Sequence, residues 1–503
     1  MLIFNMKNIL IMKNIYNIII VMFVFTTLIS CVDQLTKEPI GLLTIDQIDA
    51  SPTVTTIESS VLSSYDPLKS TLNSIVPGWR WDLGTVFRND IVLQDMASND
   101  MDKKWNPDGD QPWMDEIVEF TFTSENQAFN GIWVYDYEGI SRVNLAIGFL
   151  EDDQVVSDSG LDPERRKQLL AEAYFLRAFY YFDLVNNFGD VPLVLSPPES
   201  FEEAFSVSVR APVDEVWAQI NTDLTDAKAT ASNDKYPDVS EPWRVSKGAI
   251  IALQAKVALF NEEWSLVLSL ITELDGLGNY SLNADYFDSF DANIKFTDNE
   301  VIFAYDHRSN ETPNNVNGLR SPVGWGFFAP TADFVAAFEP NDPRLLFTTT
   351  ADPGNKFSPK IVGSTDWIDF GNKIYIRYAD VLVWKAEALL ETADLPGAIA
   401  IINQIRNRAR TSATIDGSAI PPGTLPDRGS STNASEVKDW LVSERRVELG
   451  FEAQRFNDLK RWGTAKSVLT ALGRNYQDHN NLYPIPQLDI DKSGGSITQN
   501  PGY

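Results

Sequence analysis

The chain has 503 residues and a formal net charge of −29, from 41 basic and 70 acidic residues. A surface this acidic repels phosphate backbones, which argues against nucleic acid as a partner. The length supports a large core, while a single cysteine and two histidines leave no material for a disulfide framework or a zinc cluster.

The N-terminus has the layout of a secretory signal. Lys7 and Lys13 precede an uncharged apolar run over 18–29, which is shorter than the roughly 20 residues that a membrane span needs. The run ends in Leu-Ile-Ser-Cys, which resembles a bacterial lipobox whose cysteine, here Cys31, becomes lipidated. An ordinary signal peptide with a chance cysteine is the alternative. We expect a lipoprotein signal peptide over 1–30, a lipid-anchored tether over 31–45 and one domain over 46–503.

Amphipathic helices are predicted after the tether, the first over 164–188. Gly189 and Pro192 then end it, as a glycine just past a helix and a proline beyond it should. Its apolar residues recur at spacings of three and four and form one stripe: Leu169, Ala173, Leu176, Tyr180, Leu184 and Phe188.

Further helices are predicted over 246–260, 378–391 and 396–409. The short turn between the last two predicts an antiparallel hairpin. A fourth helical region begins near Asn433, with Glu436 as the partner in a capping box. Such pairs resemble tetratricopeptide units without a strict 34-residue repeat.

Long loop-rich stretches separate these helices, over 76–125, 189–213, 275–375 and 411–432. Loops of this length in a compact exported protein are usually functional. We therefore expect a mostly α fold, a helical scaffold that carries an irregular ligand face rich in aromatic residues.

Seven blocks follow one another along the chain: GIWVYDYEGISRVNLAI (131–147), AEAYFLRAFYYFDLVNNFGDVPL (171–193), EVIFAYDH (300–307), FVAAFEPNDPRL (334–345), KIYIRYADVLVWKAEALLE (373–391), SERRVELGFEAQRFNDLKRWG (443–463) and LYPIPQLDIDKSGGSITQNPGY (482–503). In this order and behind a lipobox, they resemble the SusD/RagB family of nutrient-binding outer-membrane lipoproteins of Bacteroidetes. The resemblance implies a tetratricopeptide-like scaffold whose loops bind the ligand. It also implies a partner, a SusC-like TonB-dependent transporter over which the lipoprotein sits as a lid.

The function that the resemblance implies is capture of a glycan at the cell surface and its delivery to that transporter. Uptake of peptides, in the manner of RagB, is the alternative, because some family members bind peptides. The number of tryptophans in loops favours the glycan.

The 443–463 block carries charges of opposite sign at helical spacings. Such a pattern predicts a buried or half-buried ion-pair network and not a catalytic centre. The residues concerned are Glu444, Arg445, Arg446, Glu448, Arg455, Asp458 and Arg461.

The sequence contains few motifs that are typical of enzymes. His307 and His479 lie far apart, and the sequence has no HExxH, GxSxG or phosphate-binding loop. We expect a binding protein without a cofactor or metal; a secreted glycoside hydrolase with paired carboxylates is the alternative. NPDGD over 106–110 alternates oxygen ligands but lacks the length and terminal glutamate of an EF-hand, so we interpret it as a solvated acidic turn.

Aromatic residues in loops are the candidate ligand contacts. Sugar rings stack their C–H faces on Trp or Tyr, while Asn, Asp and Arg bind the hydroxyls around them. One region holds Trp79, Arg80, Trp81, Asn99, Asp100, Trp105 and Trp113, and the other holds His307, Arg308, Asn310, Trp325, Phe327 and Phe328. The predicted ligand-binding residues are Trp81, Asn99, Asp100, Trp105, Arg308 and Trp325.

Trp105 and Trp325 are the two residues on which the site prediction mainly rests. Core packing is the alternative for each aromatic residue. The family resemblance supports the two regions but no individual position. MASNDMDKKW over 96–105 also lacks the Gly-Gly pair that many members carry there.

Overall fold

The structure is a computed structural model that describes residues 52–69, 75, 88–103, 110–305, 323, 326–349, 358–365 and 371–503, with only the backbone of Phe201. The chain divides into two compact units, Met1–Pro52 and Thr53–Tyr503. The predicted signal peptide, tether and lipidated Cys31 all lie outside the described residues. No helix in the described ranges is long and apolar enough to cross a membrane.

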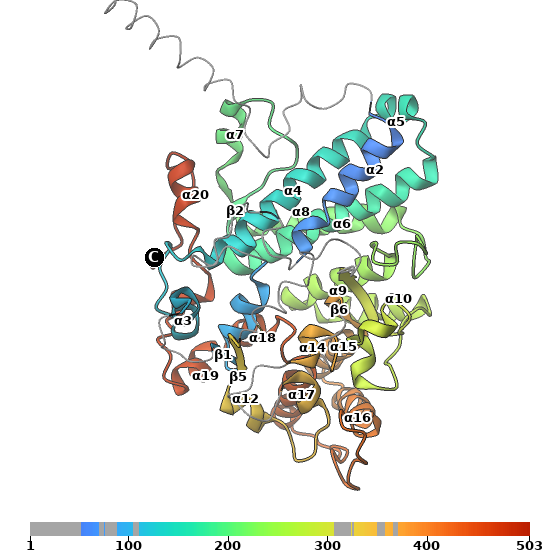
Figure 1. Ribbon diagram of the computed structural model, residues 1–503, viewed down its shortest axis with the longest axis vertical. Coiled ribbons are helices and arrows are strands. Elements are labelled where there is room, and N and C mark those ends of the chain that lie inside the picture. Colours follow the sequence, from blue (N-terminus) through green and yellow to red (C-terminus); the bar gives the residue numbers. More distant parts are fainter. Residues whose placement is uncertain are drawn as a thin grey trace, which may run out of the picture. The chain divides into compact units, whose positions relative to one another are not determined.

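Four helices form the first part of the second unit, and α6 packs between α4 and α8 (Figure 1). They are α2 (Val54–Ser63), α4 (Asn130–Glu151), α6 (Pro163–Phe188) and α8 (Val213–Thr230). The side chain of Asp162 accepts hydrogen bonds from the backbone of the first turn of α6, and Gly189 ends the helix at φ 73°. The whole predicted apolar stripe is buried, so the prediction for this helix is confirmed.

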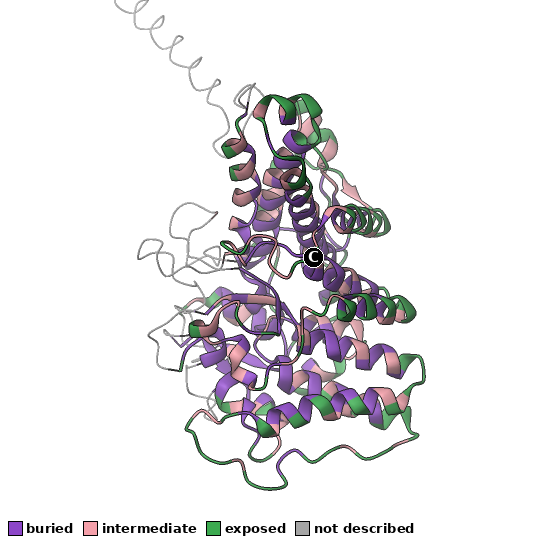
Figure 2. Ribbon diagram, turned by 90° about the vertical axis from the view of Figure 1, so that its right-hand side faces the viewer, coloured by how far each residue is buried: buried purple, intermediate pink, exposed green. Residues whose placement is uncertain are grey.

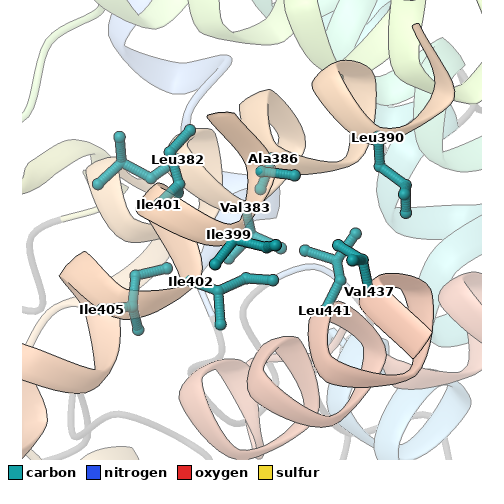
Figure 3. Close-up of a cluster of buried hydrophobic side chains, with 11 residues drawn as sticks. Leu382, Val383, Ala386, Leu390, Ile399, Ile401, Ile402, Ile405, Val437 and Leu441 are labelled. Atoms are coloured by element: carbon teal, nitrogen blue, oxygen red, sulfur yellow. The ribbon is translucent and has the colours of Figure 1, made fainter. Parts of the chain in front are cut away.

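Helical pairs form the rest of the scaffold: α9 (Lys247–Phe260) with α10 (Trp264–Gly276), and α15 (Tyr378–Glu391) with α16 (Leu395–Thr411). The helix α17 (Ala434–Leu449) packs against both members of the second pair. Their shared core contains Leu382 and Ala386 of α15, Ile402 of α16, and Val437 and Leu441 of α17 (Figure 3). The predicted hairpin is therefore confirmed.

The capping box predicted for α17 is wrong. Asn433 does cap the helix, because its side chain accepts a hydrogen bond from the backbone N–H of Ser435. The carboxylate of Glu436, however, accepts a hydrogen bond from Ser431 Oγ at 2.6 Å, and Ser431 Oγ also accepts the backbone N–H of Asn433. The serine thus takes both partners that a capping box would have joined.

The described strands are short and form two-stranded antiparallel ribbons. They are β1 (Met101–Lys103) with β5 (Phe328–Pro330), β2 (Val191–Pro192) with β3 (Arg210–Ala211), and β4 (Val301–Tyr305) with β6 (Lys373–Arg377). The third ribbon joins the 300–307 block to the 373–391 block.

Three of the four predicted loop stretches contain short elements, so that prediction was too coarse. The remaining elements are η2 (Asp66–Leu68), η4 (Val92–Met96), α3 (Pro112–Glu119), η5 (Gln127–Phe129), α5 (Asp153–Ser159), α7 (Phe201–Val207), η6 (Tyr286–Ser289), η7 (Ala292–Ile294), α12 (Ala332–Ala337), α13 (Arg344–Thr348), α14 (Pro359–Val362), α18 (Arg455–Arg461), α19 (Ala465–Ala471), η8 (Asp478–Asn481) and α20 (Gln487–Lys492). Between α16 and α17 the chain is irregular, as predicted.

Buried charges tie α17 to the rest of the second unit; Figure 2 shows how much of the helical scaffold is buried. Arg344 Nη1 lies 2.6 Å from Glu444 and 3.0 Å from Glu448. Arg377 Nη1 lies 2.6 Å from Glu300 and 2.8 Å from Glu448. Burial alone would raise the pKa of Glu448, but the surrounding arginines hold it well below its usual value.

The other charges of the 443–463 block are paired in the same way. Arg445 contacts Asp380 and Asp458, and Arg461 contacts Asp458 and Glu387. The pairs Arg445–Asp380 and Arg461–Glu387 join α17 and α18 to α15, while Arg461–Asp458 lies within α18. Each of these carboxylates is buried. The prediction of an ion-pair network is therefore confirmed.

Candidate functional site

The ribbon of β1 and β5 joins the two loop regions in which we predicted ligand contacts. Lys103, the last residue of β1, pairs with Phe328, the first residue of β5. Because the strands are antiparallel, the chain leaves β1 at the same end of the ribbon at which it enters β5. Trp105 follows Lys103 by two residues and Trp325 precedes Phe328 by three, although neither tryptophan is among the described residues.

Arg446 of α17 holds this ribbon from one side. Its Nε donates to Asp100 Oδ1 at 2.7 Å, and its Nη2 donates to Asp333 Oδ2 at 2.7 Å and to the carbonyl oxygen of Asn99 at 3.0 Å. Burial opposes the charge on Arg446, but the two aspartates outweigh it and raise the pKa of Arg446. Asp100 directly precedes β1 and Asp333 lies in α12, just after β5, so one guanidinium connects both strands.

Asn99 and Asp100 are the two predicted ligand contacts that the structure describes. Their exposed fractions are 3% and 1%. Asn99 Nδ2 donates to Asp333 at 2.8 Å, and Asn99 Oδ1 accepts from Arg455 Nε at 3.1 Å. Thr331 Oγ1 donates to the carbonyl of Asn99 at 2.7 Å. All these contacts are internal, so Asn99 and Asp100 support the ribbon.

Lys103 connects the ribbon to the segment that follows the first loop. Its ammonium donates to Asp115 of α3 at 2.9 Å and also to the carbonyl of Asp110. The side chain of Lys103 is fully buried. Lys103 therefore anchors the start of α3 to the end of β1.

Arg474, in the loop after α19, holds β1 from another side. It donates to the carbonyl oxygens of Met96, Ser98 and Met101 and to Asp102 Oδ1, the last at 2.6 Å. Arg474 therefore adds to the contacts of Arg446 with the segment between η4 and the end of β1, and it does so mostly through backbone carbonyls.

The remaining aromatic candidates divide between buried residues and residues outside the described ranges. Trp113, Phe327 and Phe328 are buried, and Trp113 Nε1 donates to Gln111 at 2.9 Å. These three side chains pack in the interior, so for them the alternative of core packing holds. The residues outside the described ranges are Trp79, Arg80, Trp81, Trp105, His307, Arg308, Asn310 and Trp325.

Three residues that build this site were not predicted from the sequence: Lys103, Asp333 and Arg474. Their partners lie far away in the sequence, and the chain offers many other acids and bases with which each could pair. Only the position of Asp333, in the first turn of α12 after the cap Thr331, could have pointed to it, because acidic residues favour helix N-termini.

The described residues hold no group of three histidine, cysteine or acidic side chains that could bind a metal ion. The ring of His479 packs edge-to-face against that of Tyr503, with 4.8 Å between the ring centroids. His307 and most of the acidic turn at 106–110 lie outside the described residues. The described part of the site is thus a polar network of Arg446, Arg474 and Lys103 around the β1–β5 ribbon.

Family models match two parts of the chain. Residues 57–259 match a family described as starch-binding and associating with the outer membrane, and residues 362–503 match the SusD family. Together the two matches cover more than half of the chain.

Relatives match almost the entire chain. SusD-like protein P2 of Formosa agariphila is 24% identical and covers 95% of this chain and 97% of its own length. A solved laminarin-binding SusD-like protein is 24% identical, with a TM-score of 0.69, and covers 90% of this chain and all of its own. Surface glycan-binding protein A from Bacteroides thetaiotaomicron, solved with laminarihexaose, is 20% identical, with a TM-score of 0.68 and coverage of 89% and 100%. The predicted fold class, a mostly α tetratricopeptide-like scaffold, is confirmed.

Proposed function

This chain belongs to the SusD family, and we propose that it captures glycans at the cell surface and delivers them to a SusC-like TonB-dependent transporter. The description of the family that matches 57–259 supports association with the outer membrane. Two structures with the same fold are, by name, a laminarin-binding protein and a complex with laminarihexaose.

The pairing of β1 with β5 is the observation that carries the proposal for the ligand site. It gives the two tryptophan-bearing loops a common base, held by Arg446, Arg474 and Lys103. A base fixed before binding reduces the entropy lost when a ligand orders the loops. Trp105 and Trp325 then supply the flat apolar faces on which pyranose rings stack.

The charge of the protein narrows the class of glycan. A net charge of −29 repels sulfated and uronate-rich polysaccharides over distances of about a Debye length. We therefore propose that the ligand is a neutral oligosaccharide or polysaccharide.

Calorimetry of the purified protein tests the proposal. The panel consists of oligosaccharides from laminarin and from starch, a sulfated polysaccharide and a peptide digest. Saturable heat with a neutral glycan supports glycan capture. A binding signal with the peptide digest alone would favour the alternative, peptide uptake. The absence of a binding signal with every glycan would contradict the proposal.

Lipidation of Cys31 is a separate part of the proposal. We propose that a signal peptide over 1–30 is removed and that Cys31 then anchors the protein in the outer membrane. Labelled palmitate should enter the wild-type protein but not the Cys31→Ser variant, which should appear in the soluble fraction. Equal labelling of both proteins would contradict the assignment.

A further inference from the structure

Asp95 is a buried acid in η4, the helical segment that leads toward the β1–β5 ribbon. The residue is fully buried. One oxygen of its carboxyl group, Oδ2, accepts the backbone N–H of Ala453 at 2.8 Å. The other oxygen, Oδ1, is buried without a hydrogen-bond partner among the described residues. The described contacts therefore satisfy only half of this carboxyl group.

Asp95 forms no ion pair with any residue that the structure describes. The positive groups on the elements around it contact other residues: Lys360 contacts Glu452, Arg446 contacts Asp100 and Asp333, Arg474 contacts Asp102, Lys103 contacts Asp115, and Arg455 contacts Asn99. Two further acids on these elements also have partners, Glu116 with Asn126, and Asp458 with Arg445 and Arg461. Asp95 therefore lacks a counter-ion in the described part of the chain.

A second acid, Asp100, follows Asp95 closely along the chain. Ser98 closes the turn between them, because its Oγ donates to the carbonyl oxygen of Asp95 at 2.6 Å and accepts the N–H of Asp100 at 3.1 Å. Burial raises the pKa of Asp95 well above its ordinary value. The hydrogen bond from Ala453 opposes this effect, and the charge of Asp100 adds to it.

A fully buried carboxylate without a cation is costly, and such a group binds a proton instead. The neutral carboxyl group still accepts the N–H of Ala453, and it has a proton of its own to donate. An ionised Asp95 that is hydrated by a buried water is the alternative.

We propose that Asp95 carries a proton in the folded protein at neutral pH and acts as a pH-sensitive switch beneath the two ligand loops. Loss of the proton places an unpaired charge between η4 and α18. This charge destabilises the segment that holds Asp100 and β1 in place. The effect on ligand binding rests on the proposed glycan site, whereas the protonation of Asp95 does not.

The pH dependence of stability, compared between wild type and Asp95→Asn, tests the protonation without any ligand. Asparagine keeps an oxygen for the N–H of Ala453 and replaces the proton with an amide N–H. The unfolded chain, in which the pKa of aspartate is near 3.9, releases the proton that the folded chain keeps. Stability from this group is therefore lost as the pH rises. The ratio of the unfolding constants, wild type to variant, should rise about tenfold per pH unit from about pH 5 up to the pKa of folded Asp95. A ratio that stays constant would overturn the proposal.

Asp458→Asn is the matched control for the loss of a buried acid. Asp458 is buried in α18, but it contacts Arg445 at 2.6 Å and Arg461 at 2.9 Å. At pH 7 this change should lower the Tm, because it removes a charge that both arginines contact. Asp95→Asn should keep or raise the Tm. An Asp95→Asn protein that fails to fold, or whose Tm falls as far as that of Asp458→Asn, would also overturn the proposal.

The affinity for the glycan, measured by calorimetry between about pH 6 and 9, tests the switch itself. The wild type should lose affinity as the pH rises, whereas the affinity of Asp95→Asn should stay constant. Equal pH responses in the two proteins would overturn the switch. The absence of glycan binding at every pH would instead contradict the proposed function, while the ratio of unfolding constants still decides whether Asp95 is protonated.

Discussion

The guanidinium of Arg446 lies between Asp100 and Asp333, at 2.7 Å from a carboxylate oxygen of each. Asp100 leads into β1 and Asp333 follows β5, so this one side chain fixes the relative position of the strands from which both predicted ligand loops extend. The helix that carries it, α17, belongs to the scaffold. The scaffold and the ligand site are therefore coupled through a partly buried ion pair.

Replacement of Arg446 by Met should destabilise the fold. Asp100, which is 1% exposed, would lose its closest cation, and breaking a buried pair in this way costs about 3–5 kcal/mol. The free energy of unfolding in urea measures the effect. Arg410→Met is the matched control, since Arg410 pairs at 2.7 Å with Asp427, whose side chain is 59% exposed. That change should cost less than about 1 kcal/mol, and equal losses in the two variants would contradict the assigned role.

The lowered pKa of Glu387 predicts that the free energy of unfolding falls at acidic pH. Burial would raise its pKa, but Arg461 and Lys438 lower it to about 2. The unfolded chain, with a pKa near 4.3, binds this proton more readily. The Glu387 carboxylate therefore contributes about 3 kcal/mol to the free energy of unfolding above about pH 4.3. This contribution is lost as the pH falls toward 2.

The comparison of wild type with Glu387→Gln measures this contribution. Unfolding free energies between pH 6 and 3 should show the difference between the two proteins shrinking as the pH falls. A difference that stays constant over this range would show that the carboxylate does not titrate as proposed.

The core between α15, α16 and α17 gives a prediction for packing. Ile402 is 1% exposed, and Ile402→Ala should lower the free energy of unfolding by about 2–5 kcal/mol through the cavity it leaves. Leu472→Ala serves as the control, because Leu472 is 42% exposed and should change stability by no more than about 0.5 kcal/mol. Similar losses at both positions would contradict the assigned core.

The helices could be predicted from the sequence because their signals are local. In α6, Gly189 and Pro192 mark the C-terminal end, and the apolar stripe before them repeats every three to four residues. The capping box of α17 shows the limit of such patterns. Ser431, two residues before the cap, competes for the same partners, and propensity alone does not decide between them.

The ligand site could be predicted only as two regions. The strands β1 and β5 have three residues each, too few for a pattern of alternation, and their pairing joins distant parts of the sequence. Asn99 and Asp100 are predicted as ligand contacts because amide and carboxylate side chains beside loop aromatics bind sugar hydroxyls. Their burial depends on Arg446 and Arg455, whose positions only the folded chain determines.

The affinity of the protein for its glycan, measured by calorimetry in single tryptophan variants, tests the central claim most directly. Trp105→Ala and Trp325→Ala should each weaken binding of the glycan found in the panel by about fivefold or more, since loss of a stacked aromatic ring costs about 1–3 kcal/mol. Trp264→Ala, at the start of α10, should bind as the wild type does, and all three variants should keep its Tm within a few degrees. Unchanged affinity in both loop variants would contradict the account of the site.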